Sequence, residues 1–200
     1  HLHMFFMNLD GAAFSDAPLL NAKSLGISYL SNNTVLRTYS DKDNHVHIYS
    51  FKTDGTIYDA LFPQGTQSAA YNGRSLDQSK FWGTFSDGSL QHSFVTNADG
   101  SDFIDLTPKD SGGSFIWGIT PDSKRVYGSF FPPNQTNPHQ NRAFISNIDG
   151  TGFIDVTPAG AKNAYVISMS KDGTRINGTY TDQDNNSHSF SVKQDGTGFV

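Results

Sequence analysis

The chain contains no cysteine, and this absence removes several kinds of site. Disulfide bonds, thiolate nucleophiles and cysteine-based zinc sites all require that side chain. Glutamate is absent as well, so every acidic side chain is an aspartate. A glycosidase built on this sequence would therefore have to use two aspartates as its pair of carboxyl groups.

Positive charge is scarce, and long apolar runs are missing. Lysine and arginine number 14 against 19 acidic residues, which leaves a formal net charge of -5. Such a chain offers no cationic surface for a phosphate backbone, so nucleic acid is not an expected partner. No apolar run approaches the roughly 20 residues of a membrane-spanning helix. With 36% hydrophobic residues the sequence instead predicts a soluble globular domain.

The sequence does contain an internal repeat, marked by Asp-Gly pairs that recur every 44 to 50 residues. These pairs begin at Asp10, Asp54, Asp99, Asp149 and Asp195. An aromatic residue stands six positions before each glycine, at Phe5, Tyr49, Phe94, Phe144 and Phe190. Another stands three positions after it, at Phe14, Tyr58, Phe103, Phe153 and Phe199. A polar column lies eight positions before it, at His3, His47, His92, Arg142 and His188.

A second pair of segments lies upstream in each complete unit. Apolar residues four positions apart, such as Val126 and Phe130, share one face of a predicted strand. The position between them is glycine in three units, at Gly83, Gly128 and Gly178, and Arg37 in the first unit. Glycine inside a strand usually marks the close approach of another backbone, so we expect tight packing between neighbouring units.

Each unit therefore predicts four short antiparallel strands, and no helical periodicity is present. Units of this length and strand content are typical of β-propeller blades, so the predicted fold is an all-β propeller forming a single domain over residues 1–200. Three arrangements remain open: a fragment of a longer propeller, a closed ring with a degenerate fifth blade, and blades completed by another chain in a homo-oligomer. The predicted repeats cover approximately residues 22–65, 66–112, 113–161 and 162–200, with a partial repeat at 1–21.

The units resemble known propeller repeats. Segments such as "GITPDSKRVYGSF" and "SKDGTRINGTY", followed by "NIDGTGF" and "DVTP", resemble those of TolB, the periplasmic Tol-Pal component, and the HAF-type repeats of bacterial extracellular proteins. The resemblance implies a non-catalytic binding or scaffold module for a protein or glycan partner, in the periplasm or outside a bacterial cell. The alternative is a fragment of a propeller glycosidase or lyase. No catalytic motif is present, so no catalytic residue is predicted.

Two equivalent polar loops carry candidate metal ligands. His45 and His47 share one face of a strand, directly after Asp41 and Asp43, and these residue types can hold a divalent metal such as zinc. Asp182 and Asp184 occupy the matching loop of the last unit. Alternating oxygen ligands suggest calcium, although the distant glutamate of calcium loops is missing. The competing interpretation is that both loops are polar β-turns and that no cofactor binds.

Five further residues are candidate ligand contacts. Trp82 and Tyr127 share one column and Trp117 lies on another strand, and each could stack on a sugar ring. Packing between blades is the competing interpretation for all three. Arg37 and Arg74 interrupt columns that are otherwise small or apolar. A guanidinium suits a carboxylate or phosphate ligand, and pairing with a neighbouring aspartate is the alternative.

Overall fold

The structure of the chain is a computed structural model that describes residues 2–7, 14–19, 22–31, 34–52, 54–133 and 140–200. Every regular element in these residues is a β-strand. The described residues contain no helix long and apolar enough to cross a membrane. Asn32 and Asn33 of the first unit lie outside the described residues.

Antiparallel strands form four successive sheets, preceded by a hairpin of β1 (Leu2–Met7) and β2 (Phe14–Leu19). The first sheet contains β3 (Ala22–Ser31), β4 (Thr34–Asp41), β5 (Val46–Lys52) and β6 (Ile57–Leu61). The second contains β7 (Ser68–Arg74), β8 (Lys80–Ser86), β9 (Gln91–Asn97) and β10 (Ile104–Asp105). The third contains β11 (Ser114–Ile119), β12 (Arg125–Phe130), β13 (Arg142–Asn147) and β14 (Ile154–Asp155). The last contains β15 (Asn163–Met169), β16 (Arg175–Thr181) and β17 (Ser187–Lys193).

The end of the chain supplies the missing outer position of the last sheet. Ser191 and Val200 exchange two backbone hydrogen bonds of 2.9 and 3.0 Å, so the terminal residues run beside β17. Each of the four sheets thus repeats one meander of antiparallel segments. The predicted all-β architecture of propeller blades is confirmed.

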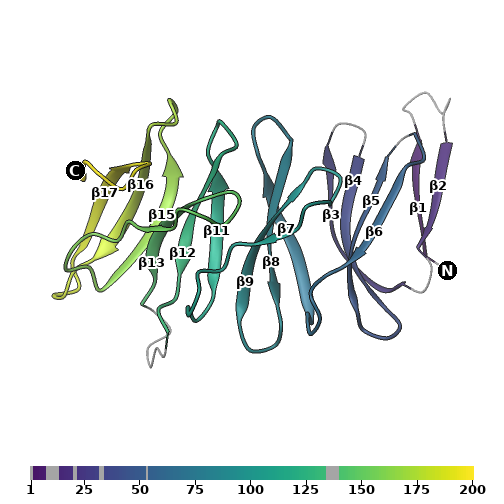
Figure 1. The fold of residues 1–200 in the computed structure, drawn as a ribbon, viewed down its shortest axis with the longest axis horizontal. Coiled ribbons are helices and arrows are strands. Elements are labelled where there is room, and N and C mark those ends of the chain that lie inside the picture. Colours follow the sequence, from purple (N-terminus) through teal and green to yellow (C-terminus); the bar gives the residue numbers. More distant parts are fainter. Residues whose placement is uncertain (1, 8–13, 20–21, 32–33, 53, 134–139) are drawn as a thin grey trace.

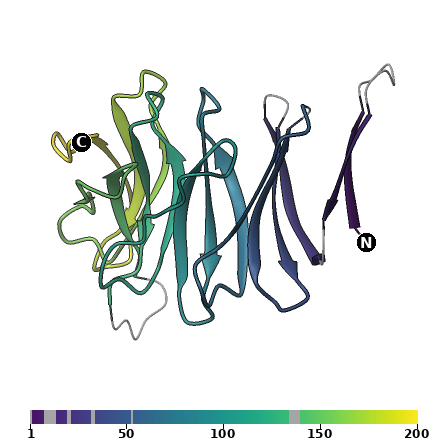
Figure 2. The same cartoon turned by 45° about the vertical axis from the view of Figure 1, so that its right-hand side comes forward.

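In the part of the chain that the structure describes, the sheets stand side by side in sequence order and do not close into a ring. Figure 1 shows the β1–β2 hairpin and β17 at opposite ends of the row, and Figure 2 shows the same order from another angle. The first strands of neighbouring sheets contact one another, β3 with β7, β7 with β11, and β11 with β15. A closed ring with a fifth blade, one of the arrangements considered above, is therefore not what the structure shows.

The core lies between the sheets and is built from the repeated aromatic columns. Phe94 is fully buried between the first and second sheets, and its ring stacks on that of Phe103 with centroids 5.3 Å apart. Phe144 and Phe153 repeat this pair in the third sheet at 5.5 Å. Because one ring of each pair comes from the third strand and the other follows the Asp-Gly turn, the predicted columns meet across the outer hairpin.

The strand glycines lie where a side chain would collide with the same sheet. A Cβ atom on Gly128 would lie 2.1 Å from the backbone oxygen of Phe115 and 2.8 Å from the ring of Phe144. Gly83 and Gly178 are confined in the same way. The predicted close approach is confirmed, but the approaching groups belong to the flanking strands of the same sheet and not to a neighbouring blade.

The last sheet differs from the others on the face that points away from the row. At the position before the strand glycine, the second and third sheets carry Trp82 and Tyr127 against their neighbours, whereas the last sheet carries Asn177. Five residues before the Asp-Gly glycine, Ile145 is buried and Ser191 replaces it in the last sheet. Thr179 joins them, and the same face also presents Ile167 and Val200, which are both exposed.

Candidate functional site

Three adjacent strands each carry a one-residue bulge that exposes a side chain. In β7, β11 and β15 the pairing with the second strand of the sheet shifts by one residue. The extra residues are Asn72, Trp117 and Ile167, and all three are exposed. Bulges re-aim side chains and occur often beside functional sites. Because the three strands are neighbours, the bulges place these side chains along one surface, which we call the bulge line.

Trp117 is the aromatic member of the bulge line, and its ring is held in one orientation. The residue is 49% exposed. Its indole Nε1 donates a hydrogen bond of 3.0 Å to the hydroxyl of Ser129. The ring also stacks on Phe115, with centroids 6.1 Å apart and planes 20° from parallel. A fixed and half-exposed indole whose polar atom is already satisfied presents a flat apolar surface to a ligand.

Trp82 and Tyr127 lie between sheets and support the packing interpretation. A Cβ atom on Gly73 would lie 2.3 Å from the Trp82 ring, and one on Gly118 would lie 2.3 Å from the Tyr127 hydroxyl. Both rings thus cover glycines that follow the bulges of their own sheets, and both pack against apolar residues of the next sheet. Burial raises the pKa of the Tyr127 hydroxyl.

The two candidate arginines lie on different sheets. Arg74 ends β7, where its Nη1 donates to the side-chain oxygen of Gln78 at 3.4 Å within the following turn. Arg37 lies in the middle of β4, opposite Tyr49 of β5, and desolvation by burial lowers its pKa. Each guanidinium is thus engaged with its own surroundings.

The polar column forms a repeated clamp in which a basic side chain meets aspartates of its own sheet. The His47 ring stacks on Tyr39 at a centroid distance of 4.4 Å. Its Nδ1 lies 2.8 Å from Asp59 and its Nε2 lies 3.4 Å from Asp41. The imidazole therefore joins the end of the second strand to the fourth strand, which explains a polar residue at this position.

The clamp recurs in the other sheets. His92 stacks on Phe85 and lies 3.2 and 3.4 Å from Asp105 and Asp87. In the third sheet, Arg142 makes a 2.6 Å ion pair with Asp155. In the last sheet, His188 stacks on Tyr180 and lies 2.8 Å from Asp182.

Stability should decline in acid because the loop aspartates are held in their charged form. The side-chain hydrogen bond from His188 and the backbone N–H of Asn186 lower the pKa of Asp182 to about 2. An unfolded aspartate titrates near about 3.9, so this contribution is complete above that pH and is lost as the pH falls toward 2. We expect urea unfolding at pH 6, 4 and 2.5 to show this loss. Asp182→Asn should weaken the dependence, and an unchanged acid dependence would contradict the assignment.

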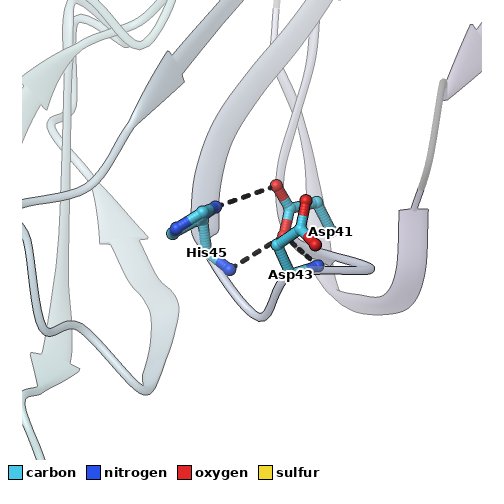
Figure 3. Close-up of side chains that lie close together, drawn as sticks. All are labelled: Asp41, Asp43 and His45. Carbon is cyan, nitrogen blue, oxygen red and sulfur yellow. Dashed lines mark hydrogen bonds and ion pairs between the residues drawn. The ribbon is translucent and has the colours of Figure 1, made fainter.

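The two candidate metal loops take up equivalent positions in the first and last sheets. Asp41, Asp43 and His45 bring ligand atoms within 4.8 Å of one another (Figure 3). No other group of three histidine or aspartate side chains in the described residues lies this close together. Asp182 and Asp184 lie in the matching turn of the last sheet, between β16 and β17.

The fold and its surfaces define a β-propeller-type repeat protein, and comparison with known proteins agrees. No family model and no curated protein matches the chain. The putative TolB from Agrobacterium tumefaciens is similar over 98% of this chain and 72% of its own, with 15% identity and a TM-score of 0.52. The TolB-type propeller fold indicated by the repeats is thus confirmed.

Two peptidase structures contain similar blades. A prolyl endopeptidase matches 90% of this chain at 15% identity with a TM-score of 0.57. The tricorn protease matches 94% at 10% identity with a TM-score of 0.59. This chain spans only 29% and 19% of those two proteins, respectively. At such identities the likeness concerns the fold, because one propeller scaffold serves many functions.

Proposed function

We propose that this chain is a non-catalytic binding module of an exported bacterial protein and that the bulge line contacts a protein partner. The observation that carries the proposal is the fixed, half-exposed ring of Trp117, with Ile167, which is 63% exposed, at the equivalent bulge of the next sheet. Exposed apolar side chains grouped on one surface mark interaction sites, and tryptophan is enriched at their centres. A glycan that stacks on Trp117 is the alternative partner.

The hydrogen bonds that the aspartates accept within their own turns support a structural role for these side chains. Those with shifted pKa values in the described residues are all lowered, chiefly by donors from their own turns. In Asp172, for example, the hydroxyl of Ser170 and the N–H of Thr174 lower the pKa to about 2. A general acid requires the opposite shift. These contacts favour a scaffold over a propeller glycosidase or lyase.

The proposal is tested by selecting ligands and then removing the indole. The chain would be immobilised and offered a displayed peptide library and, separately, a panel of oligosaccharides. We expect selected peptides to bind with affinity that falls at least about tenfold on Trp117→Ala, because a central aromatic contact contributes about 2 kcal/mol or more. Binding would be measured by surface plasmon resonance.

Leu76→Ala is the matched control, since this residue is exposed but lies in the turn after β7, away from the bulges. Affinity should not change in this variant. Oligosaccharide ligands that depend on Trp117 would replace the protein partner with a glycan. If the selected peptides and the selected oligosaccharides all bind the Trp117→Ala variant as well as they bind the parent, the proposed surface is refuted.

A further inference from the structure

The loop between β4 and β5 holds Asp41 in a fixed orientation. One carboxylate oxygen, Oδ1, accepts hydrogen bonds of 2.9 Å from the backbone N–H groups of Asp43 and His45. Asn44 adopts a left-handed conformation with φ of 65°, which closes the turn. The second oxygen, Oδ2, is left to face the side chains beside the turn (Figure 3).

Two imidazole nitrogens converge on that second oxygen. His45 Nδ1 lies 3.2 Å from Asp41 Oδ2, and His47 Nε2 lies 3.4 Å from the same atom. Two ligands bound to one zinc ion at bond lengths of about 2.0–2.1 Å and tetrahedral angles are about 3.3–3.4 Å apart. Asp41 Oδ2 therefore lies from each of the two nitrogens at the separation that two ligands of one small cation would have.

The ring of His47 also contacts a second carboxylate through its other nitrogen, as the rings of metal-binding histidines usually do. Its Nδ1 lies 2.8 Å from Asp59 Oδ1, so that carboxylate can hold a proton on Nδ1, and Nε2 is the nitrogen available to an ion. A carboxylate behind a ligating imidazole fixes its tautomer and increases its basicity. Asp59 belongs to β6, so the fourth strand of the sheet positions this ligand.

The last sheet builds the same loop without the extra imidazole. Asp182 accepts from the N–H groups of Asp184 and Asn186 at 2.9 and 2.8 Å, and Asn185 has the same left-handed φ of 67°. Asn186 occupies the position of His45 and donates its amide to Asp182 at 3.1 Å. Neither the turn nor the clamp therefore requires a histidine at position 45.

The second sheet leads to the same conclusion. His92 lies 3.4 Å from Asp87 in the clamp, but Ser89 and Leu90 follow Asp87 where the first loop has Asp43 and its neighbours. The clamp thus forms with neither the second carboxylate nor the second imidazole. The additional donors in the first loop need another explanation.

We propose that Asp41, Asp43 and His45 bind a divalent transition-metal ion of the zinc class, with His47 as a fourth donor. Mixed imidazole and carboxylate ligands suit zinc, whereas calcium takes six to eight oxygen atoms. Of the proposed ligands, His45 also lines a pocket of about 740 Å³ together with Leu61 and Pro63. The site is independent of the bulge line.

The test is titration of the chelator-treated chain with zinc chloride by isothermal calorimetry, with calcium chloride as the comparison. His1→Ala/His3→Ala serves as the background so that the N-terminal histidines do not bind the ion. We expect one zinc per chain and no calcium binding at the same concentrations. His45→Asn should weaken zinc binding at least tenfold, while melting of the metal-free protein stays unchanged because Asn186 already makes the equivalent contact.

Asn186→His in the His45→Asn background is the reciprocal variant, because it gives the last loop the donor set of the first. Zinc binding should reappear there. Zinc affinity that does not depend on His45, a preference for calcium, or no heat of zinc binding at millimolar concentration would each overturn the proposal. None of these results bears on Trp117, so failure of the metal site is distinguishable from failure of the proposed function.

Discussion

Phe94→Ala is expected to lower the free energy of unfolding by about 3–5 kcal/mol, the range for removing a buried aromatic side chain. The ring is completely buried and lies between two sheets. It contacts Phe62 and Tyr71 edge-on, each at a centroid distance of 5.2 Å. Its removal therefore leaves a cavity among rigid rings that cannot all move inward. Urea unfolding followed by circular dichroism would measure the loss.

Phe199→Ala provides the comparison, because Phe199 also belongs to one of the two repeated aromatic columns. This residue is 45% exposed and lies at the outer edge of the last sheet. We expect a loss of about 1 kcal/mol, because only part of the side chain leaves water on folding. If Phe94→Ala cost less than about 1 kcal/mol, the register of the aromatic columns would be wrong.

Gly128→Ala is expected to have the second largest effect, a loss of about 3 kcal/mol at the upper end of the range for overpacking. The new methyl group would meet the backbone oxygen of Phe115 at 2.1 Å. A side chain could rotate away, but this oxygen belongs to the paired strand and can move only if the pairing between β11 and β12 is distorted. Thermal melting and urea unfolding should both report the loss.

Arg37→Gly is the reverse change at the corresponding position of the first sheet. There the pairing of β3 with β4 is interrupted between Leu25 and Ser28, and a long side chain is accommodated. Glycine should cost about 0.5–1 kcal/mol there through backbone entropy, in addition to the loss of the interactions that the Arg37 side chain makes. A Gly128→Ala protein as stable as the parent would show that the strand glycines are not required by sterics.

The sequence period predicted contacts that lie within one repeat. The stacking of Phe94 on Phe103 and the polar role of His92 both follow from columns at fixed distances from the Asp-Gly turn. The sequence period could not show that Trp82 is packed between sheets and Trp117 is half-exposed, because the exposure of Trp117 depends on a one-residue bulge in β11. A bulge changes which way a side chain points without leaving a residue type that marks it.

The candidate metal loop was visible in the sequence only in part. Asp41, Asp43 and His45 are close along the chain, so their proximity follows from a tight turn. Asp59 lies 12 residues from its partner His47 and reaches it only because β5 and β6 pair. The register of that pairing depends on the hairpin between the strands, so the support for His47 could not be read from spacing alone.

The outward face of the last sheet mixes polar and apolar side chains. Two apolar sheet faces associate because water is released from both, and Asn177, Thr179 and Ser191 hold water by hydrogen bonds instead. A surface that packs against this face would therefore need hydrogen-bonding groups opposite these polar side chains as well as apolar contacts with Ile167 and Val200.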